Sequence, residues 1–557
     1  MALHIFLRET SPLYRNTSFL WCLHTTKTGM ALNWPGLLSI GVFYLIVLAT
    51  GVWASRKSKR EERKCTGNLS EVAMVGGRNL NIWVSIFTTT ATWVGGGFIL
   101  GNAEVVYDPN CGLAWAIGPI GYSLTLIVGA LFFVKPVREK NYVTIMDPFQ
   151  EKYGNILTAI LFIPSVLADV FWIACVLAAL GGTVSVIMDI PSPLAVILSA
   201  AVAVLYTLLG GLYSVAYTDV IQLILMFVGL WFCVPFILMS KSSSDITVTA
   251  VNKLYQEPWL GRLELADTGR WLDDLLLVTL GGICYQAFYQ RVLATATVAQ
   301  AQITCYAASF FCFTLAIPSI LIGAVAASTG LLLALEPLLP PGCPLLTLPC
   351  CLLPHFFPRN IYKNIIRKRA SEKEILLVVK VSIFLFGFMG AGLAMTTSSV
   401  YVFWMLSGDV MYSVVCAQLI CVLFMSGSVN GYGAFAGLVV GLLLRLLAGE
   451  PLIGVPGLIP LPWDRIQEDG RLLHLFPFRT CIMLVSVATI LVVSHSATYL
   501  FLKGLLPKNW DKYGLGQKRM ISVEDMVAME PNEKIELNKR PLHPLPNVIN
   551  EELSSLQ

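Results

Sequence analysis

Apolar runs of about 20 residues alternate with short polar loops along most of this chain, the pattern of α-helices that cross a bilayer. The polar loops between the runs are distinct enough for the spans to be counted. The pattern predicts about 12 or 13 transmembrane helices, one of which is broken near 80–104 and another of which, the ninth, is missing or degraded. The other spans are expected at about 37–54, 113–134, 156–187, 194–213, 271–293, 303–327, 375–395, 401–425, 432–447 and 481–502, with the sixth span ending near 239. We therefore expect an all-α polytopic membrane protein embedded in a lipid bilayer.

Composition agrees with this class. Of the 557 residues, 56% are hydrophobic and only 13% are charged, whereas soluble domains have roughly 25% charged residues. The 14 cysteines form no paired CxxC set, and several, such as Cys175, Cys233 and Cys421, lie inside apolar runs. We interpret them as small core residues, without disulfide or metal roles.

The positions of the basic residues predict the orientation of the chain. A basic cluster follows the first span, and cytoplasmic loops carry the excess of lysine and arginine. The amino terminus is therefore expected outside, and the polar tail, residues 503–557, inside as a flexible regulatory segment. Residues 1–29 are poorly patterned and are interpreted as an extension ahead of the transmembrane domain, residues 30–502. The cluster consists of Arg56, Lys57, Lys59, Arg60, Arg63 and Lys64.

The expected orientation fails at residues 330–358. Span 8 should end outside near Ala327, while the basic cluster that begins at Arg359 should lie inside, so a ninth span is required between them. That segment contains seven prolines, each of which costs about 3 kcal/mol in a helix interior. The prolines are Pro337, Pro340, Pro341, Pro344, Pro349, Pro354 and Pro358.

The second span, residues 85–104, has three glycines at its centre: Gly95, Gly96 and Gly97. Each costs roughly 1 kcal/mol relative to alanine in a helix interior. Breaks of this kind are tolerated within a membrane where the freed backbone groups line a cavity or bind an ion. We therefore expect a broken helix here.

Span 7 contains a second glycine pair, Gly281 and Gly282. Counting five spans per unit, the two interruptions fall in the first helix of each half, a first repeat at about 80–240 and a second at about 271–425 that is disrupted at 330–358. Paired broken helices indicate the midplane site of an inverted-repeat secondary transporter. Ordinary close packing of helices, which also recruits glycine, is the alternative.

Four aromatic residues are candidates for a substrate site: Trp93, Tyr122, Trp172 and Tyr285. Trp93 and Tyr285 lie within the two interruptions, and the other two lie in spans 3 and 4. Aromatic faces that converge on a cavity attract a quaternary ammonium ion, with about 2 kcal/mol or more per desolvated contact. Core packing is the alternative for each residue taken alone.

Acidic residues within the spans are few. Asp169 lies three residues before Trp172 and hence on the same helix face, so it is a candidate counter-charge or a residue of a solvated vestibule. Glu104, Asp219 and Asp409 fall near predicted span ends, where we expect hydration. The sequence has no phosphate loop, metal-binding cluster or nucleophile arrangement, and we expect neither an enzyme nor a nucleic-acid partner.

Four further motifs stand out in the sequence: TATWVGGG (90–97), AIGPIGYSL (116–124), YTLLGGLYSVAYTDVIQL (206–223) and EPWLG (257–261). They resemble the choline transporters of the sodium:solute symporter family, and the similarity runs from about 30 to 329 and resumes from 359 to about 502. The resemblance implies a leucine-transporter-like 5+5 inverted repeat, no enzymatic cofactor, and uptake of choline with sodium and chloride as coupling ions. It also implies a plasma-membrane protein of presynaptic terminals and vesicles that supplies acetylcholine synthesis, and it is compatible with a homo-oligomer.

The resemblance implies roles for individual residues. Trp93, Tyr122 and Trp172 match aromatic positions of the family's choline pocket, whereas Tyr285 stands where the family usually has tryptophan and offers a weaker aromatic face.

Ala91 and Val94 match the positions whose carbonyls bind sodium in the family. The other half of that sodium site comes from hydroxyls of the ninth helix, which has no counterpart in this chain. We interpret the segment 330–358 as a change introduced by alternative splicing or an incorrect gene model. Two alternatives are a non-transporting sensor or partner of an intact transporter, and a symporter for another quaternary amine.

Overall fold

The computed structural model describes residues 80–188, 190–209, 212–240, 243–252, 258–329, 371–396, 399–450, 461–466 and 472–513, with isolated positions between 38 and 78, 362 and 370, and 455 and 459, and at 515. The expected extension at 1–29, the proline-rich segment 330–358 and most of the tail lie outside these residues.

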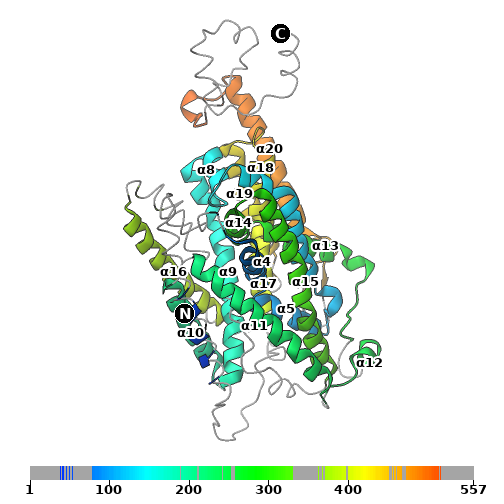
Figure 1. The fold of residues 1–557 in the computed structure, drawn as a ribbon. Coiled ribbons are helices and arrows are strands. Elements are labelled where there is room, and N and C mark those ends of the chain that lie inside the picture. Colours follow the sequence, from blue (N-terminus) through cyan, green and yellow to red (C-terminus); the bar gives the residue numbers. More distant parts are fainter. Residues whose placement is uncertain are drawn as a thin grey trace, which may run out of the picture.

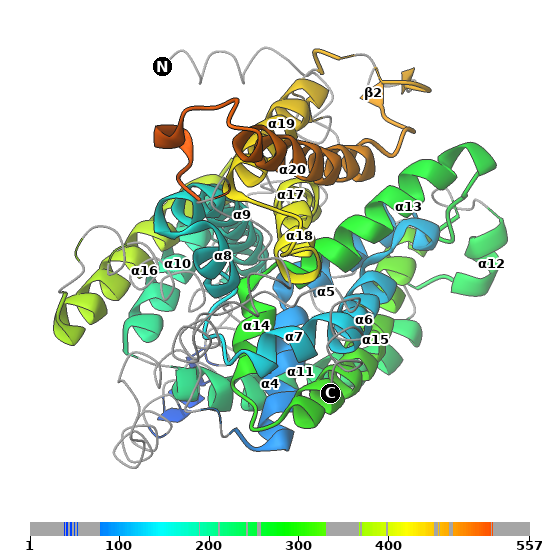
Figure 2. The same cartoon turned by 90° about the horizontal axis from the view of Figure 1, so that it is seen from above.

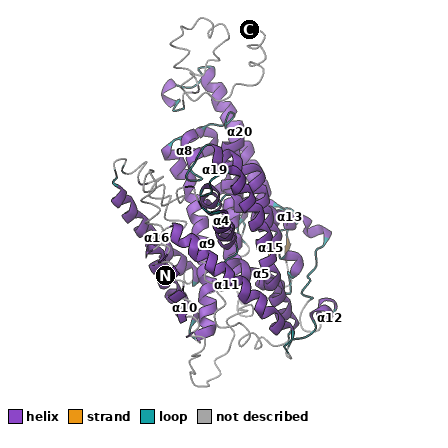
Figure 3. Cartoon of the chain, viewed as in Figure 1, coloured by secondary structure: helices purple, strands orange, loops and turns teal. Residues whose placement is uncertain are grey.

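The described chain is almost entirely helical (Figure 3). The first half contains α4 (Ile82–Trp93), α5 (Gly96–Tyr107), η3 (Leu113–Trp115), α6 (Gly118–Val128), η4 (Gly129–Phe133), α7 (Val134–Glu139), α8 (Asp147–Tyr153), α9 (Asn155–Met188), α10 (Ser192–Leu209), α11 (Leu212–Leu238) and α12 (Ile246–Val251).

The second half begins with the divided span 7. It contains η5 (Leu265–Asp267), α13 (Thr268–Leu276), η6 (Leu277–Gly281), α14 (Gln286–Leu293), α15 (Val298–Ser328), α16 (Glu372–Ala394), α17 (Val400–Val410), η11 (Met411–Cys416), α18 (Ala417–Phe424), α19 (Gly431–Ala448), β1 (Arg465–Ile466), β2 (Leu472–Leu473), α20 (Phe478–Leu502) and η13 (Lys508–Trp510). β1 and β2 form a small antiparallel hairpin.

Among the described residues, eight helices are long and apolar enough to cross a membrane, and the bent pair α4–α5 makes a ninth. The predicted all-α polytopic class is confirmed. The described residues supply fewer full-length spans than the expected 12 or 13, in part because span 7 is divided into short pieces. The expected first span is described only at isolated positions.

The broken helices lie inside the bundle. α5 packs against both α15 and α9, and α4 packs against α11 and α15. Seen from above, α5 and α14 lie toward the centre of the molecule (Figure 2). α10 and α16 cover α9 along one edge, and α19 pairs with α20 (Figure 1). Side chains at the two breaks are therefore placed in the core.

α15 ends at Ser328, whose hydroxyl contacts that of Thr249 on α12 (Oγ–Oγ1 2.5 Å). The next long helix, α16, begins at Glu372. The predicted ninth crossing belongs between these two ends, at residues that lie outside the described part of the chain.

Candidate functional site

The first break lies between α4 and α5. α4 ends at Trp93, Val94 and Gly95 are not helical, and α5 continues at an angle of 47°. Gly95 caps α5 in an extended conformation, and Gly96 and Gly97 are its first two residues. The glycines therefore open the second half of the broken helix.

Gly97 also permits a close approach to α9. A Cβ atom at Gly97 would lie 2.4 Å from the Sγ atom of Cys175. The close-packing explanation weighed for these glycines applies to this position.

The second break follows its glycine pair. Gly281 ends the π-helix η6, Gly282 is still helical, and the chain leaves the helix at Cys284 and Tyr285, where Tyr285 caps α14. A Cβ atom at Gly281 would lie 2.8 Å from the Gly408 carbonyl oxygen, and one at Gly282 would lie 2.7 Å from Thr125. Gly281 and Gly282 are thus close-packing residues ahead of the break.

The structure brings together the four candidate aromatic residues from four different spans. Trp93 lies at the end of α4, Tyr122 on α6, Trp172 on α9 and Tyr285 at the start of α14. The ring centroids are 4.9 Å apart for Trp93 and Tyr122, 6.4 Å for Trp93 and Tyr285, 5.4 Å for Trp172 and Tyr285, and 6.5 Å for Tyr122 and Trp172. We call these four residues the aromatic cluster.

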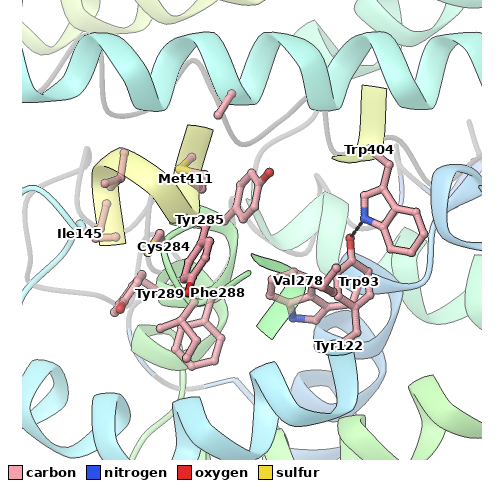
Figure 4. Packing of buried hydrophobic residues seen from close by; sticks show 14 of the residues in the cluster. Trp93, Tyr122, Ile145, Val278, Cys284, Tyr285, Phe288, Tyr289, Trp404 and Met411 are labelled. Carbon is pink, nitrogen blue, oxygen red and sulfur yellow. Dashed lines mark hydrogen bonds between the residues drawn. The ribbon is translucent and has the colours of Figure 1, made fainter. Parts of the chain in front are cut away.

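Two further aromatic residues, Phe98 and Trp404, extend the aromatic cluster. Phe98 stacks on Tyr122 with centroids 5.3 Å apart, and Trp404 donates its indole N–H to the Tyr122 hydroxyl (Figure 4). Sequence reasoning missed Trp404 because a tryptophan in an apolar run has the pattern of a core residue. Trp404 also lies only three residues into the predicted span 401–425, where interfacial tryptophans gather, so no local signal distinguished it.

The rings of the aromatic cluster touch one another. Trp93, Tyr122 and Tyr285 are 2%, 2% and 6% exposed, and Trp93 meets both tyrosines edge to face. A cation bound to the ring faces would lie within about 6 Å of each centroid. Admission of an ammonium ion therefore requires the rings on the two broken helices to separate.

Asp169 lies beside the aromatic cluster. It is half-buried and precedes Trp172 by three residues on α9, hence on the same helix face. It lies on α9, next to Ala168, whose carbonyl accepts a hydrogen bond from Ser407. A carboxylate in this position attracts a cation toward the rings.

The first break leaves several backbone carbonyl oxygens without a hydrogen-bond donor. No hydrogen bond between described residues reaches the carbonyl oxygens of Ala91, Thr92, Trp93 or Val94. These are the last four carbonyls of a helix, which lack an intrahelical partner, and they carry the negative end of the helix dipole. The set includes both carbonyls that the family resemblance assigns to sodium.

The acids predicted to be hydrated are instead buried or paired, so this prediction was wrong. Asp219 and Asp409 are 8% and 1% exposed. Glu104 accepts hydrogen bonds from the Ser399 hydroxyl (2.6 Å) and the Tyr401 amide (3.2 Å). Helix packing covers all three side chains, and basic or polar partners take the place of water.

One ion pair joins both broken helices. Arg291 on α14 binds Asp219 on α11 (Nη2–Oδ2 2.9 Å) and Thr92 on α4 (Nε–Oγ1 2.9 Å), and the Thr88 hydroxyl donates to the same carboxylate (2.5 Å). Arg291 is 4% exposed. We call this group the Arg291 network, and it fixes α4 and α14 to α11.

A second buried group centres on Arg479 at the start of α20. Its guanidinium lies 2.6 Å from Asp274 and 3.8 Å from Asp273 on α13, and 3.3 Å from Asp409 on α17. Arg445 on α19 binds Asp409 and Glu450. This Arg479 network fixes the first half of span 7 to the last two helices.

The described cysteines are all free, and Cys175, Cys233 and Cys421 are buried. Among the described residues, no group of three or more histidine, cysteine, aspartate or glutamate side chains could hold a metal ion. The packing role expected for the cysteines agrees with these positions.

The chain is similar to proteins of known class. The profile of the sodium:solute symporter family matches residues 74–332. High affinity choline transporter 1 of Homo sapiens is 42% identical over 91% of this chain and 96% of its own length. The high-affinity choline transporter 1 of Drosophila melanogaster is 38% identical over 86% of this chain and 81% of its own length.

A solved structure shares the fold. The structure of a Na⁺-coupled sialic acid symporter in a substrate-bound outward-open state superposes with a TM-score of 0.62, covering 83% of this chain and 97% of that one, at 15% identity. At this identity the likeness concerns the fold alone. The helical architecture described above is therefore shared with that structure.

Proposed function

This chain belongs to the sodium:solute symporter family, a family of sodium-coupled transporters rather than enzymes, and we propose that its substrate is choline. The proposal depends mainly on one observation, the convergence of Trp93, Tyr122, Trp172 and Tyr285 from four spans at the two helix breaks. Aromatic faces together with a nearby carboxylate, Asp169, favour a quaternary ammonium ion.

Sodium is proposed to bind at the carbonyls of Ala91 and Val94. Their lack of hydrogen-bond donors among the described residues supports this, since freed carbonyls at the end of a half-helix coordinate sodium in transporters of this kind. A hydroxyl-bearing ninth helix would complete the site. We further propose chloride as a second coupling ion and acetylcholine synthesis as the use of the choline.

The test is uptake of radiolabelled choline by cells that express the full chain, in sodium and in N-methylglucamine. We expect specific binding but little sodium-driven uptake from the unmodified chain, because seven prolines occupy the place of the ninth span. Replacement of residues 330–358 by the ninth span of a choline-transporting relative should restore uptake that depends on sodium and chloride. Robust uptake by the unmodified chain would contradict the expected defect, and absence of choline binding would contradict the substrate assignment.

A second candidate function is a non-transporting sensor or partner of an intact transporter. The proline-rich segment favours it, since a binding site can persist where ion coupling is lost. Co-expression with an intact choline transporter should then reduce choline uptake relative to an unrelated membrane protein. Unchanged uptake, together with absence of choline binding, would exclude this candidate.

A third candidate is symport of another quaternary amine, favoured by Tyr285 at a position where the family usually has tryptophan. Competition against radiolabelled choline by a series of quaternary amines separates it from the first proposal. An amine that displaces choline at lower concentration than choline itself would support the third candidate.

We propose a plasma-membrane location with the amino terminus outside and the tail inside, in presynaptic terminals and vesicles. We also propose that residues 80–240 and 271–425 form the two inverted repeats of the transporter domain. Antibody labelling of intact cells that carry an epitope tag at either terminus tests the orientation. Labelling of the carboxyl-terminal tag without permeabilisation would contradict it.

A further inference from the structure

A chain of hydrogen bonds leads from the aromatic cluster into the helix core. The Tyr285 hydroxyl contacts the Ser407 hydroxyl, and Ser407 donates to the Ala168 carbonyl oxygen at 2.6 Å. Ser407 is fully buried, and Tyr285 is 6% exposed. The three groups come from α14, α17 and α9.

The last acceptor, the Ala168 carbonyl oxygen, determines which group donates in each of these hydrogen bonds. A carbonyl oxygen only accepts hydrogen bonds, and a serine hydroxyl has a single hydrogen. Ser407 therefore gives its hydrogen to Ala168, and Tyr285 must donate its own hydrogen to Ser407. The Tyr285 oxygen retains an acceptor site that no other described group reaches.

The Tyr122 hydroxyl has the opposite hydrogen-bonding role, since it accepts where the Tyr285 hydroxyl donates. The indole N–H of Trp404 only donates, so Tyr122 accepts from it, as the dashed line in Figure 4 marks. The hydrogen of Tyr122 has no acceptor among the described residues. The cluster thus presents one acceptor, on Tyr285, and one donor, on Tyr122.

A hydroxyl group of a ligand can meet both requirements, since it donates and accepts. A carboxylate can meet only the requirement of Tyr122, and it would face the lone pair of the Tyr285 oxygen. A methyl group would leave the acceptor site of Tyr285 and the hydrogen of Tyr122 unsatisfied. These differences separate three ligands that share the same trimethylammonium group.

We propose that Ser407 fixes the Tyr285 hydroxyl as a hydrogen-bond acceptor, so that the site selects quaternary ammonium ions that carry a hydroxyl and rejects those that carry a carboxylate. This inference rests on the proposed function, because it presumes that the rings bind the ammonium group. Ser407 acts through Tyr285 and is a positioning residue.

The test uses the full chain in cell membranes and displacement of radiolabelled choline by choline, ethyltrimethylammonium and glycine betaine. One neutral hydrogen bond corresponds to about three- to tenfold in affinity, so choline should exceed ethyltrimethylammonium by that factor and betaine should bind more weakly still. Tyr285→Phe should bring the ratio of choline to ethyltrimethylammonium toward one while the affinity for ethyltrimethylammonium stays constant.

Ser407→Ala gives the more specific result. It frees the Tyr285 hydroxyl to donate, so the affinity for betaine should rise relative to choline, a change that a merely structural role would not produce. Ser407→Thr keeps the hydroxyl and should restore the original selectivity. Tyr289→Phe is the matched control, one turn further along the chain on α14 and also buried (1% exposed), and it should leave every ratio unchanged.

The outcomes separate the proposed choline-binding function from the proposed role of the Tyr285 and Ser407 hydroxyls. If radiolabelled choline fails to bind the unmodified chain, the proposed function falls and this inference with it. If choline binds but ethyltrimethylammonium binds equally well, or Tyr285→Phe or Ser407→Ala leaves the ratios unchanged, only the role of the hydroxyl chain is overturned.

Discussion

At the first break, between α4 and α5, four consecutive carbonyl oxygens receive no hydrogen bond from described residues, whereas at the second break two carbonyls are bonded to the chain that leaves the helix. There the amides of Cys284 and Tyr285 donate to the carbonyls of Gly281 and Gly282 at 3.0 and 3.3 Å. The first break therefore offers backbone oxygens to a cation, and the second offers a side chain, Tyr285, that is held by Ser407. The two interruptions look alike in sequence but present different chemistry.

The largest effect is expected where the two broken helices are joined. Arg291→Met leaves Asp219 buried with only Thr88 as a partner, and loss of one member of a buried pair costs about 3–5 kcal/mol. The melting midpoint of the detergent-solubilised protein should fall steeply. The double variant with Asp219→Leu should recover much of the loss, because no unpaired charge remains.

The matched control for Arg291 is Arg367→Met, since the Arg367 side chain is 64% exposed in its pair with Glu374. Exposed pairs contribute about 0–1 kcal/mol, so the midpoint should barely move. Equal shifts for the two arginines would show that the Arg291 network does not hold the broken helices together.

A second prediction compares the rings at the two breaks. Trp93→Ala removes the indole face, and loss of a desolvated cation–π contact of about 2 kcal/mol corresponds to roughly 30-fold weaker choline binding. Tyr285→Ala should weaken binding less, because a phenol face attracts a cation less strongly than an indole. Trp83→Ala, at an exposed position of the same helix, is the control, and equal losses at Trp83 and Trp93 would contradict a substrate role for Trp93.

A smaller effect is expected at the helix contact of the first break. Gly97→Ala places a Cβ atom 2.4 Å from the Sγ atom of Cys175, and overpacking of this kind costs about 1 kcal/mol where one side chain can shift. Adding Cys175→Ala removes the clash and should restore the melting midpoint. Gly182→Ala has no neighbour within 4 Å of the added atom and should change little. A midpoint unaffected by Gly97→Ala would show that α5 and α9 can move apart freely.

The smallest effect concerns sodium itself. With only the carbonyl half of its site, the chain should bind sodium weakly, and at concentrations below the dissociation constant the stabilisation stays under about 0.4 kcal/mol. Melting in sodium and in N-methylglucamine should therefore nearly coincide, while the chimera with a restored ninth span should melt higher in sodium. A clear sodium shift in the unmodified chain would show that its ion site is complete.

The spans and two members of the aromatic cluster, Trp93 and Tyr285, were predictable because each has a local signal, whereas Tyr122 and Trp172 were assigned through the family resemblance. Apolar run length fixes where a helix can cross the bilayer, and Trp93 lies beside glycines that a helix disfavours. The burial of the acidic residues was not predictable. Asp219 lies near the end of a predicted span, a position that indicates hydration unless the basic partner of the residue is known. Arg291, which replaces water around Asp219, is 72 residues away in sequence.

The same reason explains the missed part of the site. Trp404 bonds to Tyr122 across 282 residues, and Ser407 bonds to Tyr285 across 122. Neither residue has an unusual local pattern, so only the folded packing reveals its contact. Gly281 and Gly282, in contrast, gave a strong local signal. They indicated the correct helix, but the helix is interrupted just after them, at Cys284 and Tyr285.

The Arg479 network has a consequence for biosynthesis. Asp273 and Asp274 are buried against a guanidinium that lies about 205 residues later in the chain. At roughly 5–20 residues per second, the ribosome needs on the order of 10–40 s to reach it. During that interval the half-made protein holds two membrane-embedded carboxyl groups without their native partner, so a chain truncated before α20 should be retained and degraded by cellular quality control.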